Sequence, residues 1–157
     1  MKIGIISDSH DHIENLSLAL EKIKRKCDVL IHCGDLCAPF VLFEFTGIET
    51  HFCFGNIDDR YRTTKIAIEQ KINLHGEVGE IEKDGKKIAF THLPKFAEGL
   101  ALTGKYDVVF YGHTHISKID KVGDCLLVNP GEIMGRKNKP SFAIYNTKNN
   151  KVEILEL

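Results

Sequence analysis

The chain has 157 residues, and its 21 basic and 22 acidic side chains give a formal net charge of −1. Hydrophobic residues make up 43% and charged residues 27%, which is typical of a globular domain and excludes a disordered chain. We therefore expect a single domain over residues 1–157. The near-zero charge argues against binding of nucleic acid through a broad positive surface.

Membrane insertion and secretion are not expected from the residue pattern. The apolar run at residues 2–6 is too short for a signal-peptide core, and no run approaches the roughly 20 apolar residues of a membrane span. The five cysteines are odd in number and form no CxxC pair, so neither a disulfide framework nor a zinc ribbon is indicated. We expect a cytoplasmic protein.

The first third of the chain alternates between strand and helix patterns. Residues 2–6 are rich in β-branched residues, and residues 13–24 carry apolar side chains at helical spacing. A second apolar run at residues 28–33 precedes a short helix at 39–46, and a third run covers 50–54. This order predicts an α/β fold with parallel strands.

The remainder of the chain contains more strands than helices. Helices are predicted over residues 62–71 and 95–104, and Asp84-Gly85 predicts a tight turn between strands at 79–83 and 86–91. Further strands are predicted at 107–111, 116–122, 124–129, 141–147 and 151–156.

Polar side chains follow the carboxyl ends of several of these strands, where open α/β sheets bind ligands. Carboxylate, amide and imidazole groups are all metal ligands. Each short motif is weak alone, but their ordered recurrence after successive strands indicates a metal site. The residues are Asp8, His10, Asp35, Asn56, His92, His113 and His115.

With these motifs the sequence resembles the metallophosphoesterase (calcineurin-like phosphoesterase) superfamily, in particular its small single-domain bacterial and archaeal phosphodiesterases. The resemblance implies two packed mixed β-sheets flanked by helices, an α/β/β/α sandwich. The matching segments are Ser7-Asp8-Ser9-His10, Cys33-Gly34-Asp35, Phe54-Gly55-Asn56, Thr91-His92, Gly112-His113-Thr114-His115 and Asn129-Pro130-Gly131.

The resemblance also implies a centre of two divalent metal ions, from among Mn, Ni, Zn, Fe and Co. Asp8, His10 and His115 would hold one ion, Asn56, His92 and His113 the other, and Asp35 would bridge the two. A bridging hydroxide would attack a small phosphodiester substrate clamped by both ions. Asp35, Asn56 and His113 are accordingly expected to be catalytic.

Two segments depart from the family pattern. Many relatives carry His after the Asn of the third motif, where it can act as an acid toward the leaving group, whereas this chain has Ile57. Asp58 and His12 are the candidates to replace it, and Asp58 is counted among the expected catalytic residues. Leu93-Pro94 follows His92 where close relatives have Gly-His, so this rim of the pocket is expected to be reshaped.

Two other functions compete with a phosphodiesterase. One is a non-catalytic protein-interaction scaffold, because one retromer subunit keeps this fold without the metal ligands; here the full ligand set favours the enzyme. The other is a nuclease, which the chain's lack of basic excess does not favour. A homodimer is left open, because small members of the family often pair.

The other histidines and three phenylalanines receive simpler interpretations. His32 is expected in the core or behind the metal ligands, and His12 at a helix start. His51 and His75 are expected on the surface of a strand or loop. The phenylalanines are expected to pack in the core: Phe40, Phe43 and Phe45.

Overall fold

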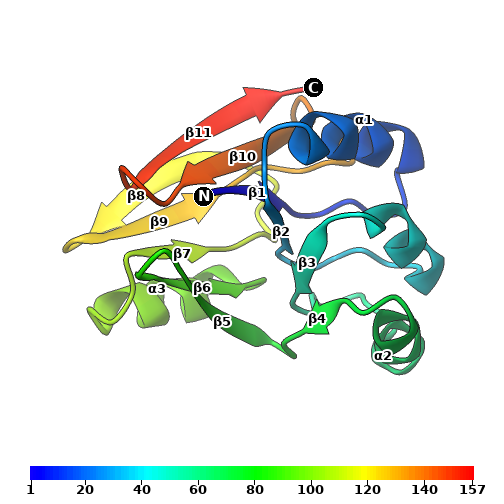
Figure 1. Ribbon diagram of the computed structural model, residues 1–157, viewed down its shortest axis with the longest axis horizontal. Coiled ribbons are helices and arrows are strands. Elements are labelled where there is room, and N and C mark those ends of the chain that lie inside the picture. The colour runs from blue at the N-terminus through cyan, green and yellow to red at the C-terminus, as the bar shows by residue number, and fades with distance from the viewer.

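The computed structural model describes residues 1–157, which form two mixed β-sheets (Figure 1). The first sheet has the order β11-β10-β1-β2-β3-β4, with bounds Lys151–Glu156, Ser141–Asn146, Lys2–Ile6, Val29–His32, Glu49–Phe52 and Asn73–Leu74. The second has the order β5-β6-β7-β9-β8, with bounds Val78–Lys83, Lys86–Thr91, Val108–Phe110, Cys125–Asn129 and Lys118–Val122. None of the helices combines the length and apolar character needed to cross a membrane.

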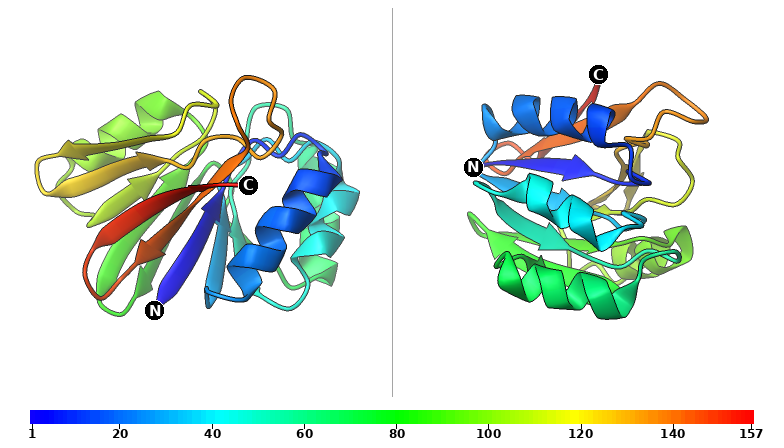
Figure 2. Two further views of the ribbon diagram at one scale, coloured as in Figure 1. Left: turned by 90° about the horizontal axis from the view of Figure 1, so that it is seen from above. Right: turned by 90° about the vertical axis from the view of Figure 1, so that its right-hand side faces the viewer.

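Helices cover the outer face of each sheet, so that four layers are stacked (Figure 2). The helix α1 (Ile13–Lys24), the 3-10 helix η1 (Pro39–Phe45) and α2 (Arg60–Glu69) lie against the first sheet. The helix α3 (Pro94–Leu102) lies against the second. The predicted sandwich of two mixed sheets flanked by helices is confirmed.

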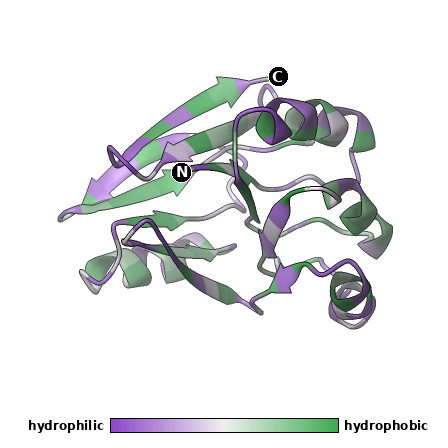
Figure 3. Ribbon diagram, viewed as in Figure 1, coloured by the Kyte–Doolittle hydropathy of each residue, from purple (hydrophilic) through white to green (hydrophobic).

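The first strand shows how one short segment serves two apolar layers. Ile3 and Ile5 are fully buried between the two sheets, whereas Ile6 belongs to the apolar cluster under α1 and η1. Side chains of a strand alternate between its faces, so a strand covered on both sides is apolar almost throughout. Hydrophobic residues accordingly recur along the strands of both sheets (Figure 3).

Parallel pairing brings the carboxyl ends of key strands to one edge of the sandwich. In the first sheet β1, β2 and β3 are parallel, and in the second β6, β7 and β9 are parallel. The register sets Ile6 beside His32 and His32 beside Phe52, so these strands end at the same level. The loops that follow them therefore meet.

Some local details differ from what the sequence indicates. The short helix expected at 39–46 is present as the 3-10 helix η1, and the two-residue strand β4, which is too short to produce a periodic pattern, was not predicted. Phe45 is buried as expected, but Phe40 and Phe43 are 55% and 48% exposed, because η1 presents only one face to the sheet. His51 is buried and hydrogen-bonded to His75, since both lie where the two sheets meet.

Candidate metal centre

All seven side chains predicted as metal ligands come together at the shared edge of the two sheets. Asp8 and His10 follow β1, Asp35 follows β2, and Asn56 lies in the loop after β3. From the second sheet, His92 directly follows β6, and His113 and His115 lie in the loop after β7.

Asp8, His10 and His115 form the first group of donor atoms, all within 4.8 Å of one another. His115 Nε2 lies 3.3 Å from Asp8 Oδ1, and His10 Nε2 lies 3.8 Å from the same oxygen. Donor atoms that share one ion at about 2.0–2.2 Å stand about 3–3.5 Å apart. The group is therefore close to the spacing of a single metal site.

Asn56, His92 and His113 form the second group. Asn56 Oδ1 lies 3.1 Å from His92 Nε2 and 3.0 Å from His113 Nδ1, and the two histidine nitrogens are 3.2 Å apart. Asp35 lies between the groups, because its Oδ2 is 3.7 Å from His10 Nε2 and 3.3 Å from His92 Nε2. The Asp35 carboxylate is thus close to both groups.

The hydrogen-bonding of two imidazoles shows that their inner nitrogens carry lone pairs. His92 Nδ1 lies 2.8 Å from the carbonyl oxygen of Cys33, which can only accept, so Nδ1 holds the proton of the neutral ring. His115 Nδ1 likewise donates to Glu132 Oε2 at 2.6 Å. In both residues the Nε2 lone pair therefore faces the lone pairs of a carboxylate oxygen. Such an arrangement is repulsive unless a cation lies between the two atoms.

Two buried atoms of the first group have no hydrogen-bond partner at all. They are Asp8 Oδ1 and His10 Nε2. Buried polar atoms without partners are costly and rare in folded proteins. With the mixed nitrogen and oxygen donor set, these orphaned atoms fit divalent transition metals.

The charged groups of the centre shift one another's pKa values. The nearby carboxylate of Asp8 raises the pKa of His10. Burial lowers the pKa of His92, but the adjacent Asp35 carboxylate outweighs it, so the net shift is upward. Burial raises the pKa of Asp35, but its contact with His92 makes the net shift downward. Opposite charges close together favour the ionised form of each partner.

Backbone strain is concentrated at the same residues. Five of the seven have positive φ angles, namely Asp8 (52°), His10 (41°), Asp35 (57°), His113 (68°) and His115 (65°). Residues other than glycine are uncommon in this region, and each such residue stores strain that the surrounding structure must overcome. The loops are thus held in conformations that turn the side chains inward.

Two glycines that precede ligands are required by close packing. A Cβ atom at Gly55 would overlap the side chain and backbone nitrogen of Asp35, and one at Gly112 would overlap the Ser7 hydroxyl. Glycine therefore lets the loops from the two sheets approach each other at the centre.

Asp58 is engaged by backbone rather than free for proton transfer. Its Oδ1 accepts from the amides of Leu36 and Cys37 at 2.8 and 2.9 Å, and its Oδ2 accepts from Asp35 and Gly55 at 3.1 and 2.7 Å. A carboxylate with four backbone donors is built to fix two loops. This geometry argues against the expected role of Asp58 as an acid toward a leaving group.

His12, the other expected candidate, begins α1, and its Nδ1 accepts from the Asn15 amide, so its predicted place at a helix start is confirmed. His32 is fully buried as predicted, and its Nδ1 accepts from the Gly34 amide while its Nε2 pairs with the Ser9 hydroxyl. Burial lowers the pKa of His32 to about 3, so the ring is neutral.

Glu132 is the functional neighbour that sequence reasoning missed. Its side chain is fully buried behind His115, and its Oε1 accepts from the amides of Lys137 and Asn138. The available signal was an acidic residue directly after Asn129-Pro130-Gly131, in a segment that otherwise continues into a polar loop.

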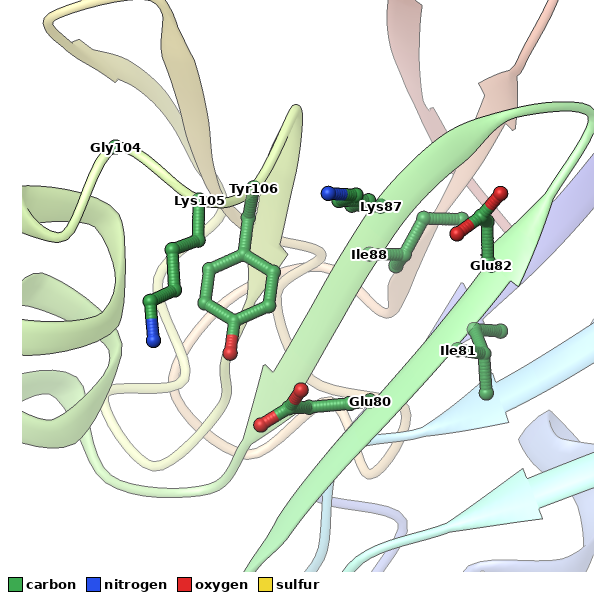
Figure 4. Close-up of a pocket in the computed structure, with 8 residues that line it drawn as sticks. All are labelled: Glu80, Ile81, Glu82, Lys87, Ile88, Gly104, Lys105 and Tyr106. Atoms are coloured by element: carbon green, nitrogen blue, oxygen red, sulfur yellow. The ribbon is translucent and has the colours of Figure 1, made fainter.

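Two cavities are partly lined by residues of β6. One, of about 210 Å³, adjoins the centre and includes Asn56 and His92 in its wall. The largest, of about 670 Å³, lies at the other end of β6 and is lined by charged side chains together with Tyr106 (Figure 4). It contains none of the seven ligands, so only the smaller cavity is connected with the centre.

Known proteins share both the sequence and the fold. The family model for the calcineurin-like phosphoesterase superfamily domain matches residues 1–150. A phosphodiesterase of Methanocaldococcus jannaschii is 35% identical over 94% of each chain, and a probable metallophosphoesterase of Methanothermobacter thermautotrophicus is 30% identical over 98% of this chain and 90% of its own. The solved structure of an archaeal phosphodiesterase, 33% identical, superposes over both whole chains with a TM-score of 0.92.

Proposed function

The chain belongs to the calcineurin-like phosphoesterase superfamily and is an enzyme of this class, and from this premise we propose that it hydrolyses small phosphodiesters with two divalent ions. The observation that carries the proposal is the convergence of seven donor side chains. Within it His92 and His115 turn lone pairs toward carboxylate oxygens, and two buried atoms are left unpaired. A scaffold without catalysis has no need to retain such an arrangement.

Each donor side chain has a proposed place. Asp8, His10 and His115 hold one ion and Asn56, His92 and His113 the other, with Asp35 between them. When bound, the ions polarise the phosphoryl oxygens and lower the pKa of water to near neutrality. Mn, Ni, Zn, Fe and Co all suit this donor set.

The protein residues orient this centre and set its charge. The Cys33 carbonyl and Glu132 fix the tautomers of His92 and His115, so that both present Nε2 inward. Asp8 and Asp35 are the only anionic ligands. Two carboxylates against two divalent cations leave a positive centre, which attracts a phosphate ester without help from Lys or Arg.

The choice of diesters rests on the two residues after Asn56. Ile57 cannot donate a proton to a departing alkoxide, and Asp58 is engaged by four amides. Substrates whose leaving groups depart without strong acid assistance are therefore favoured. The five cysteines form no disulfide, which fits the reducing cytoplasm that we infer as its location.

The proposal is tested by measuring metal content and hydrolysis of bis(p-nitrophenyl) phosphate with Mn²⁺ or Ni²⁺. We expect turnover that disappears with a chelator and returns on addition of either ion, with p-nitrophenyl phosphate hydrolysed more slowly. A folded protein that turns over no diester with any divalent ion would contradict the proposal. Cleavage of DNA in preference to small diesters would point to a nuclease instead.

A further inference from the structure

The cavity of about 210 Å³ beside the centre has the position of a substrate pocket. Asn56 and His92 form the wall nearest the centre. The other walls come from Phe54 after β3, Arg60 at the start of α2 and Phe96 on α3. The pocket therefore opens beside the group formed by Asn56, His92 and His113.

The walls of the pocket are apolar on the side of α3. Phe96 is 50% exposed although it is a large hydrophobic side chain, and Leu93 lies beside it in the lining. Leu93 directly follows His92, so it supplies apolar surface at the rim of the centre. Exposed apolar surface in a concave site is typical of ligand pockets.

The opposite wall is the guanidinium group of Arg60, which pairs with Glu77. Arg60 Nη2 donates to Glu77 Oε1 at 2.8 Å, and the Arg60 Cζ atom lies 5.1 Å from the centre of the Phe54 ring. Glu77 compensates the charge, so Arg60 is not a free cation awaiting a second phosphate. A planar guanidinium is instead a surface on which an aromatic ring can stack.

The size of the pocket restricts what enters it. Pockets for drug-sized molecules measure about 300–1,000 Å³, so a pocket of about 210 Å³ suits a single ring system rather than a whole nucleotide. We propose that this pocket binds a planar aromatic group esterified to the substrate phosphate, and that it selects phosphodiesters that carry such a group. The inference rests on the proposed function and adds a substrate class to it.

The test compares two product-like ligands that differ only in the ester group. Binding of phenyl phosphate and of methyl phosphate to the Mn²⁺-loaded protein is measured by calorimetry for the wild type, Phe96→Ala and Phe43→Ala. Phe43 is a matched control, because it is also a half-exposed phenylalanine but lies on η1 outside the pocket.

We expect the wild type to bind phenyl phosphate about tenfold more tightly than methyl phosphate. Phe96→Ala should abolish most of this preference and leave methyl phosphate within about twofold, whereas Phe43→Ala should change neither. Equal binding of the two ligands by the wild type overturns the inference. So does an equal loss of both ligands in Phe96→Ala, because that would indicate a disturbed centre.

A parallel hydrolysis assay on the wild type separates this inference from the proposed function. If phenyl phosphate is preferred but no diester is hydrolysed with any divalent ion, the pocket stands and the proposed activity fails. If diesters are hydrolysed without any preference for aromatic groups, the activity stands and the pocket inference fails.

Discussion

His115 Nδ1 lies 2.6 Å from Glu132 Oε2, which makes Glu132 the residue that decides how His115 presents itself to the metal centre. The other oxygen of the same carboxylate accepts the amides of Lys137 and Asn138. The carboxylate is therefore held in place from the loop side and fixes the proton of His115 on Nδ1. Such carboxylate partners are common behind metal-binding histidines.

We predict that Glu132→Gln weakens metal binding about 10–100-fold. The amide oxygen of Gln would take over the two loop amides, which leaves its NH₂ group facing His115. That group donates, so the histidine proton would move to Nε2 and the lone pair toward Asp8 would be lost. Titration calorimetry with Mn²⁺ measures the effect.

Glu153→Gln is the control for this prediction, because Glu153 is exposed on β11 and far from the centre in the fold. Its metal affinity should equal that of the wild type. An unchanged affinity in Glu132→Gln would show that Glu132 supports the loop and not the ligand.

We predict that Asp58→Asn lowers thermal stability as well as activity. Asn has one acceptor oxygen, so its NH₂ group would face backbone donors that Asp58 now satisfies. An unsatisfied, partly buried donor costs about 1–3 kcal/mol. A residue that only transferred protons would lower kcat without changing Tm, so the Tm separates the two roles.

The neighbouring Asp59 supplies the matched comparison. It caps α2 by accepting from the Arg62 amide, and Asn caps helices about as well as Asp. Asp59→Asn should therefore change Tm little. If Asp58→Asn kept the same Tm as Asp59→Asn but lost turnover, the expectation that Asp58 acts as an acid would be restored.

The convergence of the seven side chains was predictable because chemistry and topology mark the same positions. Asp35 and Asn56 each follow an apolar run and a glycine, and parallel strands end at a common edge. The positive φ angles of Asp8 and His113 could not be predicted, because only tertiary contacts hold side-chain-bearing residues there.

The missed features depend on contacts between distant segments. Glu132 is recognisable only once the chain places it behind His115, and Asp58 only once its oxygens meet the amides of another loop. His51 fits no motif and was expected on the surface, yet the residue is buried and its ring lies against Phe90 of the second sheet. A local sequence pattern predicts the helix or strand to which a residue belongs, but it does not predict which distant segments pack against that residue.

We predict that His113→Ala abolishes phosphodiester hydrolysis and leaves the fold intact. The His113 ring is exposed, and its polar contacts are with the ligands Asn56 and His92. Its removal therefore deprives the centre of a donor without opening a core cavity. The free energy of unfolding should change by no more than it does for a surface substitution, about 0.5 kcal/mol, so Tm should change little. Turnover and Tm are measured on the same preparation, and full activity in the variant would contradict the ligand assignment.

The His51–His75 pair lies in the first sheet at β3 and just after β4, and both rings contact Phe90 of the second sheet. His51 Nδ1 lies 2.9 Å from His75 Nε2, and the charged groups facing the pair are Glu49 and Lys83. Burial lowers the pKa of both histidines. Two nitrogens that share one proton cannot both be protonated and keep the contact.

These two lowered pKa values set the direction in which stability changes with pH. The folded protein keeps the pair neutral, whereas the unfolded chain takes up protons near the ordinary pKa of about 6.5. The stabilisation is thus complete above about pH 6.5 and is lost as the pH falls below it. A single proton bound only by the unfolded chain changes the free energy of unfolding by about 1.4 kcal/mol per pH unit.

We therefore expect the metal-free wild type to lose more stability between pH 7.5 and pH 5 than His75→Gln does. Gln can still pair with His51 but does not titrate. Because His75 is partly exposed, the difference should be about 0.5–1 kcal/mol in urea unfolding. His12→Asn serves as the control, since it also removes a histidine but keeps the cap of α1. If His75→Gln and the wild type lose equal stability on acidification, the neutral His51–His75 contact does not contribute to stability.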